Sequence, residues 1–299
     1  MRTFNIVLLA IWVGIIIFAS HALGQQAYGW LPIAAAAEAE PVGHLFSFLV
    51  TLGTIVFLGV LGMLVYSILF YRAADSDTSD APAIRGNSKL EITWTVIPIL
   101  LVIWIAGYSY NIYQRMNTLG SLPLVHLHLL EAPAYAETGS SEMQPGEQIE
   151  VIAKQWSWSF RYPNHNVTST ELHLPINQPV HLMLQSEDVV HGFFVPNFRI
   201  KQDIVPNRTI KFKFTPNRIG QYPLYDSQFS GTYFALMNAV VSVDSPDQYN
   251  QWLAQTATRS PVPAANPATS EHTQPPAIPL RSHWHTVPPA QPPVVNYPS

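Results

Sequence analysis

Two segments in the second half of the chain contain side chains that could hold a metal ion. The first carries His191, and the second carries Asp226, Ser230 and Met237. Imidazole and thioether groups bind copper, whereas a carboxylate suits hard cations and a neutral hydroxyl is a poor copper ligand. The chain has no Cys, which excludes disulfides and thiolate-bound metals. One His and one Met do not make a metal site, so we expect this chain to bind no metal or other cofactor.

The composition predicts that much of the chain lies in a membrane. Of the 299 residues, 48% are hydrophobic and 11% are charged, compared with about 25% charged residues in an average globular domain. Residues 4–23, 44–71 and 92–110 are apolar, and a transmembrane helix needs about 20 such residues. The net charge of −4 shows no basic surface for nucleic acid. We therefore expect two to three transmembrane helices in contact with lipid, and no nucleic-acid partner.

The first apolar segment, within residues 1–24, has two interpretations. A basic residue before it and small residues near its end suit a signal peptide, whereas a permanent transmembrane helix is the alternative. The loop at residues 72–90 carries three basic residues and the loop at 24–43 carries none. The positive-inside rule then puts residues 72–90 in the cytoplasm and everything after residue 110 outside. This topology, with a helical hairpin over residues 43–110, holds under both interpretations.

The pattern changes after residue 110. Residues 111–146 read as a connector, and residues 147–245 contain short alternating runs separated by Pro, Asn and Gly turn signals, which predicts a β-sandwich or barrel. Eleven of the 26 Pro residues follow residue 260, so we expect residues 260–299 to be a disordered Pro-rich tail. The strands expected in the β-domain are residues 148–153, 181–185, 209–214 and 238–243.

Four motifs between residues 43 and 243 resemble subunit II of the haem–copper terminal oxidases, the cytochrome c and quinol oxidase family. The family motifs are E-x-x-W-T…P, Q-W-x-W-S-[YF], H-[SG]-F-x-V-P…K-x-D-x-x-P-G-R and C-x-E-x-C followed by His and Met. The resemblance implies a membrane α + β fold, in which transmembrane helices precede an extracytoplasmic cupredoxin-like domain. The matching stretches here are LEITWT running to Pro98, QWSWSF at 155–160, residues 186–208 and residues 226–237.

The fourth motif departs from the family where the family binds its binuclear copper centre, CuA. Two Cys positions hold Asp226 and Ser230, and the second His position holds Phe234. Thiolates are what bridge two coppers that share an electron, so we predict a vestigial site. Gln228 replaces a Glu that helps to hold magnesium in the family, and a neutral amide is a weaker ligand. The six vestigial positions are His191, Asp226, Gln228, Ser230, Phe234 and Met237, of which only His191 and Met237 match.

Two other motifs imply roles for Glu91 and for a Trp. In the family, the Glu of the first motif lies at the cytoplasmic mouth of a proton path into subunit I, which implies proton entry at Glu91. The alternative is a carboxylate that stabilises a helix start by about 0.3–1 kcal/mol. An aromatic residue of the second motif receives electrons from cytochrome c, and Trp156 is the better match. Packing is the favoured interpretation for both Trp156 and Trp158, because the next carrier is missing.

Three functions follow. The first and favoured one is subunit II of a CuA-less quinol oxidase, resembling the cyanobacterial alternative-oxidase branch, in a plasma or thylakoid membrane with its β-domain periplasmic or lumenal. Membrane quinol would bind in subunit I or at its interface, and subunit I would hold haem and CuB and reduce O2 to water with proton translocation, with subunit III as a further partner. The second is a cytochrome c oxidase subunit II with a degenerate CuA site. The third is a stand-alone membrane-anchored cupredoxin-like binding or assembly protein, for which His126 and His128 are candidate ligands.

Overall fold

The structure, a computed structural model, describes residues 2–72, 86–116, 146–273 and 287–298. The chain forms two compact units. The first is Met1–Leu31 with Pro41–Met116, and the second is Pro32–Glu40 with Asn117–Ser299. His126 and His128 lie outside the described residues, so the ligand pair suggested for them stays a prediction.

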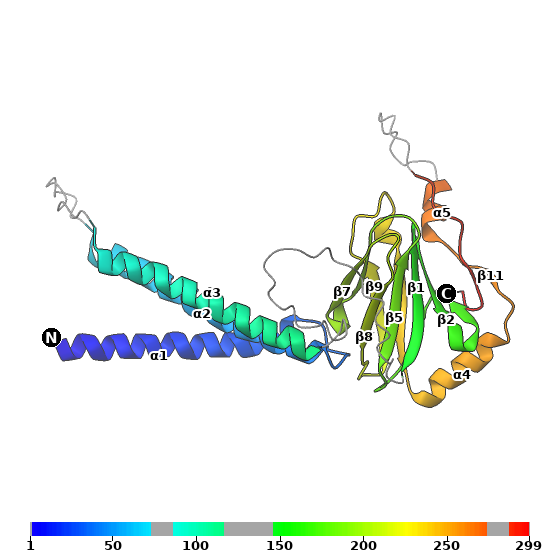
Figure 1. Ribbon diagram of the computed structural model, residues 1–299. Coiled ribbons are helices and arrows are strands. Elements are labelled where there is room, and N and C mark those ends of the chain that lie inside the picture. Colours follow the sequence, from blue (N-terminus) through cyan, green and yellow to red (C-terminus); the bar gives the residue numbers. More distant parts are fainter. Residues whose placement is uncertain (1, 73–85, 117–145, 274–286, 299) are drawn as a thin grey trace, which may run out of the picture. The chain divides into compact units, whose positions relative to one another are not determined.

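Three long helices make up the described part of the first unit (Figure 1). They are α1 (Arg2–Gln26), α2 (Ala39–Phe70) and α3 (Ser88–Met116), and a 3-10 turn, η1 (Ala27–Trp30), follows α1. Each is long and apolar enough to cross a membrane, and Pro98 lies inside α3. The predicted apolar segments are thus helical, and each helix extends beyond its apolar run at one end or both.

Small residues bring α1 and α2 close together. A side chain at Gly24 would overlap Thr51, and the Ser47 hydroxyl donates a hydrogen bond of 2.7 Å to the Gly24 carbonyl oxygen. Further along the pair, Gly62 gives room to the ring of Trp12. Small residues at such contacts are what lets transmembrane helices pack, so α1 is joined to the hairpin by specific packing.

The β-domain in the second unit is a sandwich of two five-stranded sheets with the orders β3-β2-β1-β5-β8 and β4-β10-β9-β6-β7 (Figure 1). Inward-facing apolar side chains alternate along strands such as β5 and β9, and they fill the core between the sheets. The predicted order of apolar helices followed by a cupredoxin-like β-domain is confirmed. The strands are β1 (Glu147–Lys154), β2 (Ser157–Tyr162), β3 (Val167–Ser169), β4 (Leu172–Pro175), β5 (Val180–Ser186), β6 (His191–Val195), β7 (Ile200–Ile204), β8 (Ile210–Phe214), β9 (Gly220–Asp226) and β10 (Asn238–Asp244), with 3-10 turns η2 (Pro163–His165), η3 (Pro196–Phe198) and η4 (Phe234–Leu236).

The short segment Pro32–Glu40, which precedes α2 in the chain, belongs to the second unit. The backbone of Ala35 donates to the carbonyl oxygen of Asn197 at 2.9 Å and accepts from the amide of Asn217 at 3.0 Å. The carboxylate of Glu38 accepts a hydrogen bond of 3.0 Å from the Thr215 amide. Ala35 and Ala36 are fully buried, so this segment is an integral part of the β-domain.

The prediction of a disordered tail over residues 260–299 is wrong for its described parts. Helix α4 (Pro246–Ala257) is followed by β11 (Val262–Pro263), α5 (Pro267–Thr273) and β12 (Val294–Val295), and β11 pairs with β12. Asn296 exchanges hydrogen bonds of 2.8 and 3.0 Å with Thr168 on the edge strand β3. Pro-rich chain is extended, and such chain can lie along a free sheet edge that supplies its hydrogen bonds.

Candidate functional site

The strand pairing of the β-domain brings the two vestigial copper segments together. His191 begins β6 and Asp226 ends β9, and these two strands are antiparallel neighbours. Because Gly192 has no side chain, the loop that follows β9 can approach it closely. A Cβ at this position would lie 3.0 Å from the Gln228 amide nitrogen. The Ser227 amide donates to the Gly192 carbonyl oxygen at 3.0 Å. The sheet therefore sets the distance between His191 and the loop that starts at Asp226.

His191 is hydrogen-bonded to a carboxylate on each side. Its Nδ1 lies 2.8 Å from Asp226 Oδ2, and its Nε2 lies 2.9 Å from Asp188 Oδ1. The side chains of His191 and Asp226 are fully buried, and that of Asp188 is 25% exposed. An ionised carboxylate only accepts hydrogen bonds, so both ring nitrogens carry protons and the imidazole is a cation. We call these three residues the histidine hub.

The Asp226 carboxylate is fully engaged in hydrogen bonds. Its Oδ1 accepts from the backbone amides of Gly192 at 2.7 Å and Gln228 at 3.0 Å. Its Oδ2 accepts from His191 and from the Ser230 hydroxyl, each at 2.8 Å. Each of the two carboxylate oxygens of Asp226 therefore accepts two hydrogen bonds, which is its full capacity. The oxygen atoms that stand in for a thiolate position are thus held by protein donors and offer no free lone pair to a metal ion.

Asp188 fastens the hub to the neighbouring sheet. Its carboxylate accepts hydrogen bonds from the amides of Gln155 at 2.8 Å and Val189 at 2.7 Å. Gln155 lies between β1 and β2, so the hub links the β6–β9 strand pair to the opposite sheet. The sequence does not single out Asp188 as a site residue. The only available signal is its position three residues before His191.

The hub shifts the pKa of each of its members. Burial lowers the pKa of His191, but the hydrogen bonds and negative charges of Asp188 and Asp226 outweigh it, and the net pKa is raised above 6.5. Burial raises the pKa of Asp226, but its hydrogen bonds with His191, Gly192, Gln228 and Ser230 outweigh it, and the net pKa is lowered below 3.8. The pKa of Asp188 is lowered by the same balance. All three pKa shifts therefore favour the charged forms of these groups in the folded state.

These pKa shifts predict how the hub's stabilisation depends on pH. A raised pKa at His191 stabilises the fold below pH 6.5, and this contribution is lost as the pH rises through the folded-state pKa. The lowered pKa values of the carboxyls stabilise the fold above pH 3.8, and this contribution is lost as the pH falls through their folded-state values. We expect the melting temperature of the wild type to exceed that of His191→Gln by at least about 4 °C between pH 4 and 6.5.

The measurement is thermal unfolding of the purified chain and of His191→Gln between pH 3 and 9. The difference in melting temperature between the two should shrink at both ends of this range. His173, which lies 2.7 Å from Asp244 and is present in both proteins, titrates in both and cancels in the difference. A difference that stays constant over the whole range would contradict a charged hub.

The remaining vestigial positions lie apart from the hub or contribute only their backbone. Phe234 packs against Phe229 at a ring distance of 5.2 Å. Met237 is buried, and its carbonyl oxygen accepts a hydrogen bond of 3.2 Å from the Trp158 indole. Gln228 donates only its amide to Asp226. In the described parts of the chain, no three His, Asp or Glu side chains are arranged to hold a metal ion.

Both Trp residues of the second motif are buried, with 1% of Trp156 and 2% of Trp158 exposed. The Trp156 indole donates to the Ser230 carbonyl oxygen at 3.2 Å, and its ring meets Tyr233 edge-on at 5.0 Å. The amide of Ala290, from the C-terminal segment, donates to the Gln155 carbonyl oxygen at 2.7 Å. The loop after β9 and the C-terminal segment thus meet at the position where the family resemblance implies electron entry.

Glu91 lies in the first turn of α3 and is exposed. The start of the helix is stabilised by Asn87, whose side-chain oxygen accepts from the Leu90 amide at 3.3 Å. The helix thus has a capping residue besides Glu91. Both interpretations of the Glu91 carboxylate, as a proton-entry group and as a group that stabilises the helix start, stay predictions.

Both halves of the chain are similar to known proteins. Residues 21–112 match the family model for the transmembrane domain of cytochrome c oxidase subunit II, and residues 167–244 match the model for its periplasmic domain. Cytochrome c oxidase subunit 2 of Synechocystis sp. is 33% identical over 269 residues, which cover 82% of this chain and 81% of that protein. The protein of the same name from Thermostichus vulcanus is 30% identical over 297 residues, covering 89% and 87%.

A relative with a different donor in its name is also similar. Quinol oxidase subunit 2 of Bacillus subtilis is 23% identical over 218 residues, which cover 71% of this chain and 62% of that protein. The family's order of domains confirms the predicted membrane anchor with the C-terminal domain outside. With both domains matched and most of the chain aligned to its relatives, the chain belongs to the family of subunit II of the haem–copper oxidases.

Proposed function

We propose that this chain is subunit II of a haem–copper oxidase that lacks CuA and receives its electrons from membrane quinol. The observation that supports this most directly is the histidine hub. Both ring nitrogens of His191 are bonded to carboxylates, and the Asp226 carboxylate accepts four hydrogen bonds. Without a Cys in the chain, the position offers no bridging thiolate. Electrons from an external protein donor would therefore find no metal centre in this subunit to carry them towards subunit I.

In this proposal the chain has a structural role, and the redox reaction takes place in subunit I. Two membrane quinols would together supply four electrons and four protons, and the haem and CuB that subunit I would hold would provide the site at which O2 is reduced to two water molecules. The present chain braces the complex and covers its outer face together with subunits I and III. Glu91 is proposed to lie at the proton-entry mouth on the cytoplasmic side, because it is exposed at the start of α3.

The donor side of the β-domain supports quinol over cytochrome c. Trp156 is 1% exposed, so its ring edge is not available to a docking protein. Five residues further along the chain, on β2, the Arg161 side chain is 58% exposed and lies 3.4 Å from Glu150. Cytochrome c docks through a basic face, so a cation here opposes its approach and slows association.

The second candidate is a cytochrome c oxidase subunit II with a degenerate copper site. The names of the two cyanobacterial relatives favour it, since both are called cytochrome c oxidase subunit 2. It requires electrons to reach haem directly from cytochrome c, over the added distance left by the missing carrier. The stand-alone cupredoxin-like protein has less support, because the named relatives are oxidase subunits.

Oxygen uptake by the purified complex tests the donor. With reduced quinol as the sole donor we expect rapid uptake, and with reduced cytochrome c we expect a rate at least about 100-fold lower, because the missing carrier raises the barrier by about 3 kcal/mol or more. The same donors without enzyme give the background from autoxidation. Rapid uptake with cytochrome c alone would overturn the quinol proposal and favour the degenerate cytochrome c oxidase.

A further inference from the structure

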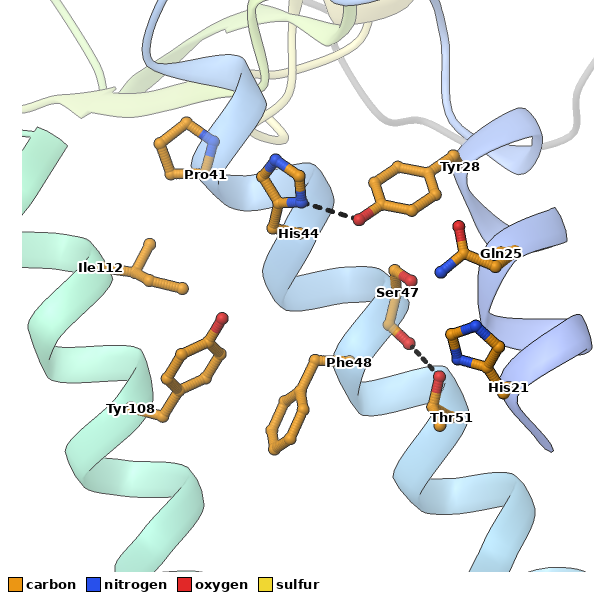
Figure 2. A pocket seen from close by; sticks show the side chains of 10 residues that line it. All are labelled: His21, Gln25, Tyr28, Pro41, His44, Ser47, Phe48, Thr51, Tyr108 and Ile112. Atoms are coloured by element: carbon orange, nitrogen blue, oxygen red, sulfur yellow. Dashed lines mark hydrogen bonds between the residues drawn. The ribbon is translucent and has the colours of Figure 1, made fainter. Parts of the chain in front are cut away.

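The ends of the three helices that lead to the outer domain border a partly open pocket within the first unit, lined by both polar and apolar side chains (Figure 2). Its volume is about 550 Å³, which is in the range of small-molecule sites. In Figure 2, α2 lies between α1 and α3, and side chains of α1 are turned towards α2. We call it the helix-end pocket, and its polar lining is His21, Gln25, Tyr28, His44, Ser47, Thr51 and Tyr108.

The pocket lies near the level where lipid headgroups meet hydrocarbon. Helix α2 has 32 residues and is therefore about 48 Å long, whereas the hydrocarbon core is about 30 Å thick. His44 and Ser47 come within the first three turns of α2, so they lie within about 12 Å of its outer end. A ligand with a polar head and an apolar tail can reach this depth directly from the bilayer.

Amphipathic side chains such as Tyr are common at this depth, so the informative question is which polar groups of the lining have no partner within the chain. Part of the lining is satisfied internally. The Tyr28 hydroxyl lies 2.7 Å from His44 Nδ1, and the Ser47 hydroxyl donates to Gly24. This leaves His44 Nε2 for a ligand. Figure 2 shows His21 and Gln25 of α1 facing α2 without a dashed bond to another drawn residue.

The lining selects a neutral ligand that both donates and accepts hydrogen bonds. None of the side chains lining the pocket is Asp, Glu, Lys or Arg, so an anionic phospholipid headgroup would find no counter-charge there. Imidazole, amide and hydroxyl groups can each match a hydroxyl or a carbonyl oxygen. Aromatic rings form one side, where Phe48 and Tyr108 lie 4.8 Å apart. These features suit a flat ring that carries two oxygen atoms.

We propose that the helix-end pocket binds the headgroup of a membrane quinol, with Gln25 and His44 as its main hydrogen-bonding groups and the apolar tail of the quinol extending into lipid. This inference rests on the proposed function, since it supposes that quinol is the donor. It concerns binding and assigns no redox step to this chain. It also requires α1 in the mature protein, because His21 and Gln25 belong to that helix.

The first test uses variants of the full oxidase complex. Gln25→Leu and His44→Leu are each expected to raise the apparent KM for quinol about 5- to 10-fold, the effect of one lost hydrogen bond, while the haem content of the purified complex stays unchanged. The matched control is Gln26→Leu, which changes the same residue type next in the chain but outside the pocket lining. A KM for quinol that is the same in Gln25→Leu, His44→Leu and the control would overturn the proposal.

The second test locates the ligand in the wild-type complex. A photoreactive azidoquinone is cross-linked, and the labelled peptides are mapped with and without excess quinol or a neutral galactolipid. Label within residues 21–51 that quinol displaces supports the proposal. Label in another subunit overturns it while uptake with quinol continues, which leaves the proposed function intact. Displacement by galactolipid alone identifies a lipid site and overturns it. Oxygen uptake that is fast with cytochrome c and absent with quinol would overturn the proposed function. The proposed quinol pocket would then be overturned as well.

The mass of the mature chain provides a direct check on α1. An intact mass that includes residues 1–24 supports a complete pocket. Removal of these residues would take His21 and most of α1 away from α2, and it would overturn the proposal whatever the donor.

Discussion

Asp226→Ala is expected to lower the free energy of unfolding of the outer domain by about 3–5 kcal/mol, the loss typical when one partner of a buried ion pair is removed. The substitution leaves the His191 imidazolium buried with one carboxylate in place of two. It also leaves the backbone amides of Gly192 and Gln228 without their acceptor. Denaturant unfolding of the purified chain, followed by the intrinsic fluorescence of its eight Trp residues, of which Trp156 and Trp158 are buried in the outer domain, measures the change.

A neighbouring carboxylate provides the control for this prediction. Asp203 on β7 lies opposite Gly192 in the sheet but is exposed, so Asp203→Ala should change the free energy of unfolding by less than about 0.5 kcal/mol. Equal losses for the two variants would show that the histidine hub does not hold the loop. A His191→Leu/Asp226→Leu double variant should recover part of the loss, because no buried charge is left on either side of that pair.

Four substitutions are expected to turn the vestigial site into one that retains copper. Asp226→Cys and Ser230→Cys supply thiolates, Phe234→His supplies an imidazole, and Gln228→Glu restores the carboxylate position. His191 then loses its Asp226 partner, so its Nδ1 becomes free to bind metal. Its Nε2 keeps the 2.9 Å contact with Asp188, and such a carboxylate commonly orients a metal-bound imidazole.

Copper content after reconstitution and removal of excess metal measures this gain. We expect the wild type to retain less than about a tenth of the copper held by the four-fold variant, since oxygen ligands compete poorly with thiolates for this metal. Adding His191→Ala to the four-fold variant should lower its copper content again. If the four-fold variant holds no more copper than the wild type, then the loop has lost the geometry of the family as well as its ligands.

The helices and the alignment of the vestigial positions could be predicted from sequence because both depend on local pattern. Apolar runs mark α1, α2 and α3 without any tertiary information. Strand β6, by contrast, is buried on nearly every residue, and β4 is buried on all of them. Neither shows the alternation that marks a half-exposed strand. These two strands can be recognised only from the folded structure, in which neighbouring strands pair with them and bury both of their faces.

The partners in the histidine hub could not be predicted, because they depend on distances across the sandwich. Asp188 looks like one of two acidic residues in an exposed turn, and only the fold shows its contact with His191. The C-terminal segment is a similar case. Its Pro content predicts disorder, but Tyr297 packs against Trp252 of α4, and Asn296 bonds to β3. Composition alone carries no information about a sheet edge that lies 128 residues earlier in the chain.

The segment Pro32–Glu40 sets a condition on how the chain is threaded through the bilayer. It packs into the same domain as residues 146–273, although α2 and α3 separate the two in sequence. Both pieces must therefore be on one side of the membrane, and the chain between them must cross it an even number of times. The two helices of the hairpin meet this condition. It agrees with the orientation that the basic loop indicates, and it is independent of any count of charges.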